Sequence, residues 1–555
     1  MSGIFDLYGF LGVLLHTLEL VAQSVLIGSV AFLWIAAVPM QRRMGAPALL
    51  ASSLRIAQVS AWILAVVALV ATLLEVTVLS AMLQISIGEA ASARFALMGA
   101  VKAIAAALAA IAARPSAAAS PTPSWRLPGL ALCVVVMFAA ALATTHATAR
   151  PMFESMLLIA TGMHRTGAAL WLGGLPCFYS ALRIVEGDPA ARAWLGKRYS
   201  AISITGVGLI LVGAIVLAVT LIGSWGAFYG TPYGAMAATK SMLLAVLLLV
   251  GLGNFLAVRR FSAGDAAITR VRRFVEIEMA FGVAVLALAA SMTSAPPGVD
   301  LADDRVTLDE LAQRLTPRPP QLETPDASSL AIASLQGRLD EEAARAGADS
   351  RARTFIPGSG EPAPRNAYDI AWSEYNHHWS GVIVLLIGVF ALLERTGRAP
   401  WARHWPLLFL GLAIFILVRA DPEVWPLGRI GLIESLRDPE VVQHRLFAIL
   451  TIAFAGFEWR VRNGRFQSQD PALVFPILMI AGGILLFAHT HAISDVKDQV
   501  LIEWSHLPLG VFAVTGGAAR WLQLRGAHRE ARWAGWVWPV CLVLTGIMLL
   551  NYREA

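Results

Sequence analysis

Long blocks of apolar residues recur from one end of the chain to the other, with short polar segments between them. Each block is about twenty residues long, the length at which a helix crosses the hydrocarbon core of a bilayer. The pattern predicts an all-α fold, a polytopic transmembrane assembly of about fourteen helices in two bundles. The predicted helices lie near residues 8–38, 57–83, 94–113, 128–146, 152–182, 201–223, 241–258, 274–292, 378–394, 405–418, 445–459, 472–490, 504–524 and 534–551.

One segment interrupts this series. Between residues 299 and 376 the chain becomes charged and rich in proline, so it is too polar for a core of its own and too long for a tight loop. We predict an eight-helix membrane bundle at 1–298, an extracytoplasmic, partly helical linker or cap at 299–376, and a six-helix, histidine-rich membrane bundle at 377–555. A disordered tether is the alternative for the middle part.

Charge predicts the orientation of the helices. The formal net charge is +6, but Lys and Arg fall mainly in every second loop, as expected of cytoplasmic loops. Arg42 and Arg43 occupy the first such loop, and Arg532 lies in the last. The pattern predicts a multi-pass protein in the lipid bilayer with both termini outside the cytoplasm, and it indicates no nucleic-acid partner. The three cysteines show no CxxC spacing, which argues against a thiolate metal site.

Six histidines in the last third of the chain lie at helix ends that the charge pattern assigns to the outer face. They are His377, His378, His444, His489, His491 and His506. Acidic residues of the same outer regions form a second group. They are Asp421, Glu423, Asp495, Asp498 and Glu503. Imidazole suits copper, zinc, iron and nickel, and the order of divalent affinities favours copper. The histidines are therefore predicted to form a pool that supplies three or four copper ligands, with the carboxylates orienting the rings or lining an entry path.

Neighbouring histidines cannot all bind one ion, because His377 and His378 diverge by about 100° on a helix, and His489 and His491 by about 200°. At each pair we expect one ring to bind and the other to form hydrogen bonds. Two alternatives stay open. Each histidine can be an interfacial side chain bonded to a backbone carbonyl, or histidines on facing helices can be the axial ligands of haem b. The acidic group can equally be a solvated rim.

The first half carries a smaller set of candidate residues, which we interpret as a conduit. They are His16, Glu19, His146, Met163 and His164. Glu19 follows His16 by three positions, so the two share a helix face and can share a proton or an ion. Interhelical hydrogen bonds are the structural alternative. His16 and His164 each precede a stretch of small residues, Ser24 to Phe32 and Gly167 to Phe178, which would let helices approach closely.

Three stretches of the first half resemble the copper resistance D (CopD) family of bacterial inner-membrane proteins. They are His164 to Leu175, Tyr233 through Lys240 to Asn254, and Arg272 to Gly282 followed by Pro296-Pro297. The resemblance covers roughly residues 140 to 300, and the second half is similar to the C-terminal extension of long family members. It implies an inner-membrane protein that moves copper from the periplasm toward the cytoplasm or passes it to a maturing cuproprotein. No Met-rich tract accompanies the histidines, which argues against a methionine relay.

The leading hypothesis is a copper-binding inner-membrane protein that takes up or hands on copper at its periplasmic face. The alternatives are a membrane electron carrier with haem b, and a docking or assembly protein whose 299–376 segment binds a periplasmic copper chaperone or a cuproprotein. The chain has no GxxxxGK[ST] loop and no DKTG motif, so ATP-driven pumping is not supported. No catalytic group stands out, and metal handling or transport is expected rather than enzymatic catalysis.

Overall fold

A computed structural model describes residues 2–115, 125–145, 150–259, 265–325, 367–437, 439–468, 470–488, 496–526 and 528–554. Within these ranges the regular structure is helical, which confirms the predicted all-α class. Eleven of the helices are long and apolar enough to cross a membrane. Their outward side chains are apolar as well; Leu249 and Val219, for example, are 70% and 71% exposed. Such surfaces suit lipid and not water, so the protein is a multi-pass membrane protein.

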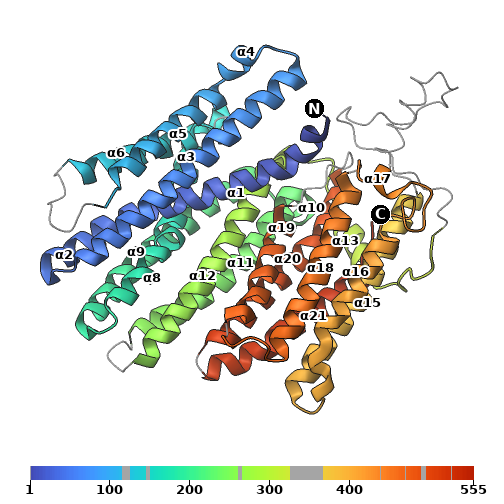
Figure 1. The fold of residues 1–555 in the computed structure, drawn as a ribbon. Helices are drawn as coiled ribbons and strands as arrows, with labels where there is room; N and C mark the ends of the chain where they lie inside the picture. Colours follow the sequence, from blue (N-terminus) through green and yellow to red (C-terminus); the bar gives the residue numbers. More distant parts are fainter. Residues whose placement is uncertain are drawn as a thin grey trace. The chain divides into compact units, whose positions relative to one another are not determined.

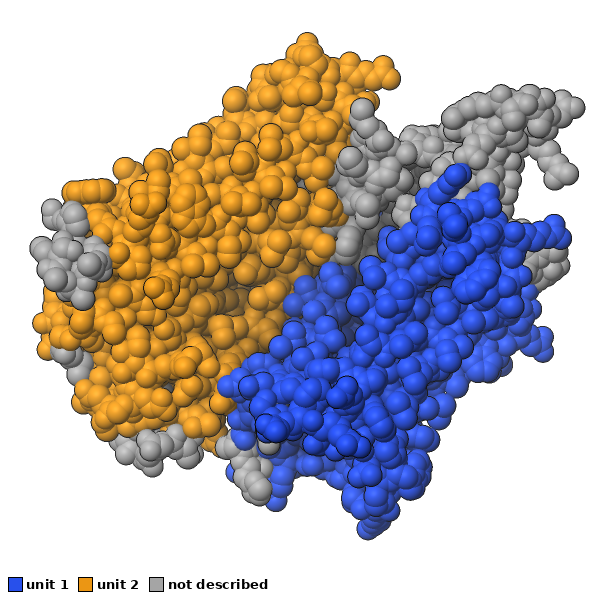
Figure 2. All heavy atoms as spheres, in the orientation of Figure 1, with its two compact units in different colours: residues 1–9, 229–235, 303–555 blue, residues 10–228, 236–302 orange. Residues whose placement is uncertain are grey.

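The chain divides into two compact units, which Figure 2 colours separately. We call residues 10–228 and 236–302 the first bundle, and residues 1–9, 229–235 and 303–555 the second bundle. The elements through the first bundle are α1 (Ser2–Phe32), η1 (Leu33–Ala37), α2 (Val38–Met44), α3 (Pro47–Leu83), α4 (Ile87–Ala91), α5 (Arg94–Ala112), α6 (Arg126–Leu142), η3 (Pro151–Phe153), α7 (Glu154–Ala168), η4 (Ala169–Gly173), α8 (Leu175–Ile184), α9 (Pro189–Leu221), α10 (Trp225–Gly230), α11 (Pro232–Val258), α12 (Asp265–Met292) and η6 (Gly298–Asp300).

The second bundle continues with α13 (Leu308–Leu315), α15 (Ala367–Thr396), η8 (Pro400–Leu407), α16 (Leu408–Arg419), α17 (Leu432–Ser435), α18 (Pro439–Arg462), η9 (Asp470–Leu473), α19 (Val474–Ala488), α20 (Val496–Arg525) and α21 (His528–Leu550). Within it α15 and α20 both pack against α21, α19 packs against α20, and α16 against α18 (Figure 1). An aromatic cluster forms part of the core. Trp405 and Trp538 lie 5.8 Å apart between ring centroids, and Phe475 lies 5.5 Å from Trp405.

Each predicted helix corresponds to an observed one, but several helices begin earlier than the apolar pattern indicates. Helix α9 begins at Pro189, not near 201, because Asp188 caps it by accepting hydrogen bonds from the backbone N–H groups of Ala190 and Ala191 at 2.9 and 3.0 Å. Helix α15 likewise begins at Ala367, ahead of the predicted start at 378. Hydropathy marks where a helix meets lipid, whereas backbone hydrogen bonding can continue the helix through polar residues beyond it.

The two small-residue stretches noted in the sequence pack directly against each other. A Cβ atom added to Gly28 of α1 would overlap the backbone of Ala169 and Gly173, and one added to Gly173 would overlap Ser24. The π-helical turn η1 follows the first stretch, and the π-helical turn η4 lies within the second. Such local widening of a helix is frequent near functional sites. Glycine at these positions is what allows the two helices to come into backbone contact.

Candidate functional site

Histidines from two helices of the second bundle come together near one end of that bundle. The ring of His377 in α15 and the ring of His506 in α20 lie edge to face, with centroids 6.0 Å apart. The Nδ1–H of His377 donates to the carbonyl of Ser373 at 2.7 Å, and that of His506 donates to Ile502 at 3.0 Å. In each case the carbonyl lies four residues earlier in the same helix. In both rings the proton therefore lies on Nδ1.

Tyr552 completes this aromatic group. Its ring stacks on His377 at 3.8 Å between centroids and meets His506 edge to face at 5.4 Å. Its hydroxyl donates to Glu554. Burial, together with the nearby Glu554 carboxylate, raises the pKa of Tyr552 well above its ordinary value. The phenol is therefore neutral at physiological pH, so it positions the imidazoles and does not serve as a phenolate ligand.

His378 is hydrogen-bonded through both ring nitrogens. Its Nδ1 accepts from the backbone N–H of Gln321 at 2.7 Å, and its Nε2–H donates to the carbonyl of Tyr552 at 2.9 Å. Trp379 bonds to the residue after Gln321, because its ring N–H donates to the carbonyl of Leu322 at 3.2 Å. His378 thus ties the end of the 303–325 segment and the C-terminal residues to the histidine end of α15.

The other predicted members of the pool lie in different positions. His444 of α18 pairs with Asp421 at 2.8 Å, the kind of contact that orients an imidazole. Glu503 is buried in α20, three residues before His506, and burial of Glu423 raises the pKa of its carboxyl group. His489, His491 and Asp495 lie outside the described residues, as does the side chain of Asp498. Among the residues that are described, no three His, Cys, Asp or Glu side chains are close enough to hold one ion.

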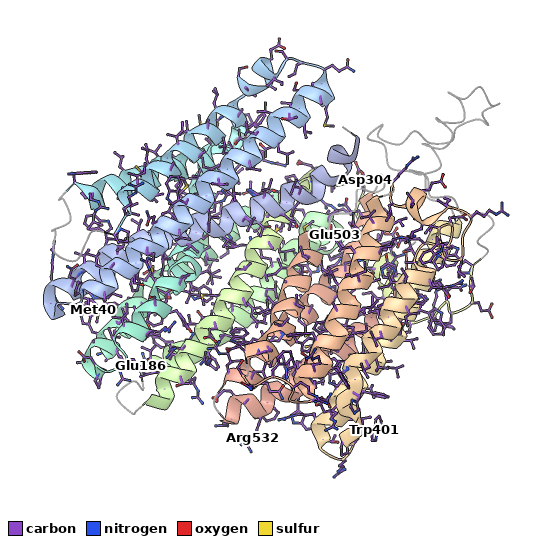
Figure 3. The ribbon with its side chains drawn as sticks, viewed as in Figure 1. Met40, Glu186, Asp304, Trp401, Glu503 and Arg532 are labelled. Carbon is purple, nitrogen blue, oxygen red and sulfur yellow. The ribbon has the colours of Figure 1, made fainter. Side chains whose placement is uncertain are left out.

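The opposite end of the second bundle is basic and aromatic. Arg462 at the end of α18 contacts Glu458 at 2.9 Å and Glu394 at 2.7 Å, and its guanidinium lies over the Trp405 ring. His404 accepts a hydrogen bond from Trp459 at 2.8 Å there. Figure 3 shows Glu503 toward one end of this bundle and Trp401 and Arg532 at the other. The two ends therefore carry different chemistry.

In the first bundle, Glu19 lies between His16 and Lys102. Its carboxylate forms an ion pair with the ammonium group of Lys102, and the second oxygen lies 3.7 Å from Nδ1 of His16. His164 binds the carbonyl of Ile210 through Nδ1 at 3.0 Å, which joins α7 to α9. Met163 is half-buried, and His146 lies outside the described residues.

Lys240 and Arg165 add further positive charge to the region around the predicted conduit. Lys240 interacts electrostatically with both His164 and Arg165. Arg165 also interacts with Glu19, the residue that Lys102 binds directly. The conduit region thus contains three cationic side chains in addition to its histidines.

Sequence reasoning missed several polar groups that the structure singles out. Lys102 interrupts an alanine-rich apolar run, and a lone charge in such a run was the available signal for it. Tyr552 follows the last apolar run and carried no signal. Glu278 accepts hydrogen bonds from Trp171 at 3.2 Å and Asn254 at 2.6 Å. Glu278, Trp171 and Asn254 lie in the three stretches that resemble the CopD family, but the sequence assigned no role to them.

The fold and these groups define a polytopic helical membrane protein with buried ionisable residues in one bundle and a histidine-bearing end in the other. Residues 194–292 match the family model described as copper resistance protein D. The chain is also 32% identical over 136 residues to the copper transport protein CutJ of Bacillus subtilis, a match that covers 24% of this chain and 24% of that relative. Both matches agree with the resemblance noted in the sequence, and they show a copper-resistance-D-like region within the first bundle. No solved structure matches the chain.

Proposed function

We propose that this protein belongs to the CopD family and handles copper, binding it at the histidine end of the second bundle and taking it up or handing it on at the periplasmic face of a bacterial inner membrane. The observation that carries the proposal is the convergence of His377 and His506 from α15 and α20, each with Nδ1 bonded to a carbonyl. Two imidazoles held in this tautomer form a ligand pair suited to copper. The relative from Bacillus subtilis is named a copper transport protein, which supports the same metal.

Further ligands would come from the rest of the histidine pool. His444 is oriented by Asp421, and His489 and His491 follow α19 in the chain. His378 has both ring nitrogens engaged, so we assign it to holding the 303–325 segment. In the first bundle, Lys102, Arg165 and Lys240 would repel a bare cation, so a conduit through His16 and His164 requires that these charges be compensated.

Copper content tests this assignment directly. Full-length protein, the double variant His377→Ala/His506→Ala and the variant His404→Ala would be purified from copper-supplemented cells, and copper per chain would be measured. We expect the double variant to lose most of its copper, with affinity reduced by at least about tenfold. His404 lies at the basic end and bonds to Trp459, so His404→Ala should keep the copper content of the parent. A folded double variant that retains its copper would exclude this pair as ligands.

Haem b is the second candidate, since imidazoles on facing helices are also a set of axial ligands. Tyr552 stacks on His377 at 3.8 Å, and a macrocycle would have to displace it. An absorption spectrum of the same preparation decides the matter. A strong Soret band that disappears in the double variant would identify haem b, and not copper, as the cofactor at this site.

The orientation and the partner belong to the same proposal. Reporter fusions at both termini should report an extracytoplasmic position. Deletion of residues 326–366 should reduce capture of a periplasmic copper chaperone or cuproprotein if this segment docks one. Unchanged capture would argue against the docking role and leave copper binding untouched.

A further inference from the structure

A cavity of about 340 Å³ lies in the first bundle among η4, α8, α9, α11 and α12. Four aromatic side chains, Trp171, Phe178, Tyr199 and Phe255, line it together with aliphatic ones. Phe178 and Tyr199 stack on each other at 4.2 Å between ring centroids. Gly251 adds no side chain on the α11 side, where a Cβ atom would lie only 3.2 Å from the Trp171 ring. These walls would suit a flat apolar group.

Two buried side chains with hydrogen-bond acceptors, Glu278 and Asn254, line the cavity. Glu278 is 2% exposed, and its two oxygens accept from Trp171 and Asn254. Asn254 is 8% exposed, and its Oδ1 atom has no hydrogen-bond partner among the described residues. A buried acceptor without a donor costs free energy, which a ligand that donates a hydrogen bond would recover. The cavity therefore lacks a hydrogen-bond donor for Asn254 Oδ1.

The mouth of the cavity lies at lipid-facing side chains. Ile204 of α9 and Leu252 of α11 both line it and are 60% and 52% exposed. Glu278 lies near the midpoint of α12 (Asp265–Met292), roughly 20 Å of helix from either end at 1.5 Å per residue. A phospholipid headgroup stays at the interface and does not reach this depth. The ligand must dissolve in the hydrocarbon region and carry its donor there.

We propose that this cavity binds the ring of a membrane hydroquinone, with a ring hydroxyl donating to Asn254 Oδ1 and the apolar tail leaving between α9 and α11. The aromatic walls accept the ring, and the open side accepts the tail. An oxidised quinone offers only acceptors, so it leaves Asn254 Oδ1 unsatisfied. A fatty acid would bring a second carboxyl group beside Glu278. The site thus selects the reduced, hydroxyl-bearing form.

The test is equilibrium binding to full-length protein in lipid nanodiscs under anaerobic conditions, with decyl-ubiquinol, decyl-ubiquinone and dodecanol as probes. We expect about one quinol per chain, bound at least about tenfold more tightly than the quinone. Asn254→Leu should abolish this preference. Asn376→Leu is the matched control, because Asn376 also has a buried Oδ1 without a partner but lies in the second bundle.

Two further variants keep the test decisive if Asn254→Leu does not fold. Ser203 lines the cavity, so Ser203→Phe should block quinol binding while Ser203→Ala preserves it. Equal binding of quinol and dodecanol would make this an acyl-chain groove and overturn the proposal. Absence of quinol binding to folded protein would also overturn the proposal. The copper content of the His377 and His506 variants is a separate readout, so the two proposals can fail independently.

Discussion

The two bundles bury ionisable side chains in different ways. In the first bundle Glu19 and Lys102 pair within membrane-spanning helices, and both side chains are nearly covered. In the second bundle Arg462 is the last residue of α18, and His377 and His506 each lie about three turns from the start of α15 and α20. A charge within a span has few alternative partners, whereas a charge at a helix end can reach water or lipid headgroups. The cost of removing a partner should therefore fall with distance from the hydrocarbon core.

The largest effect is expected for Lys102→Met. The change leaves Glu19 as a buried carboxylate without its cation, and it also removes a positive charge that interacts with Glu75. Loss of one partner of a buried ion pair costs about 3–5 kcal/mol. Thermal unfolding in detergent should show this loss as a strongly lowered midpoint or as failure to accumulate.

Glu19→Gln/Lys102→Met is the matched control for that change. Removing both charges should recover much of the lost stability, because no uncompensated ion is then left in the span. A double variant no more stable than Lys102→Met would show that packing of the lysine, and not its charge, stabilises the first bundle.

An intermediate effect is expected for Arg462→Met in the second bundle. Glu458 is fully buried and would lose its bond to Arg462, but Arg520 still interacts electrostatically with it. Hydrogen bonds to charged groups contribute about 1.5–3 kcal/mol, so we expect a loss in that range. Arg460→Met on the same helix is the control, since the Arg460 guanidinium lies over the ring of Phe466. Equal losses for Arg460→Met and Arg462→Met would contradict this reading of the helix end.

The fold was predictable because the apolar runs record where helices meet lipid, and each predicted run overlaps an observed helical element. The detail of the site was not predictable, because it depends on how helices rotate against one another. His377 and His378 are adjacent in sequence, yet one packs against His506 while the other bonds to Gln321 and Tyr552. Neither Gln321 nor Tyr552 belongs to a span, so hydropathy could not pair them with a histidine. The copper-ligand roles of these histidines stay predictions.

The smallest effect is expected at Glu310 and Lys497, which form an exposed ion pair at 2.9 Å in the second bundle. The hydrogen bond from Lys497, assisted by the capping contacts of Thr307, lowers the pKa of Glu310 to about 2. Because the folded-state pKa lies below the ordinary value of 4.5, the pair should contribute stability above about pH 4.5 and lose it as pH falls toward 2. Lys497→Met should therefore destabilise the protein only slightly at neutral pH and not at all at the acidic end, and added salt should reduce the difference. Thermal midpoints of parent and variant across this pH range measure it. A loss as large as that of Lys102→Met would mean that depth in the membrane does not decide how much a charged pair contributes.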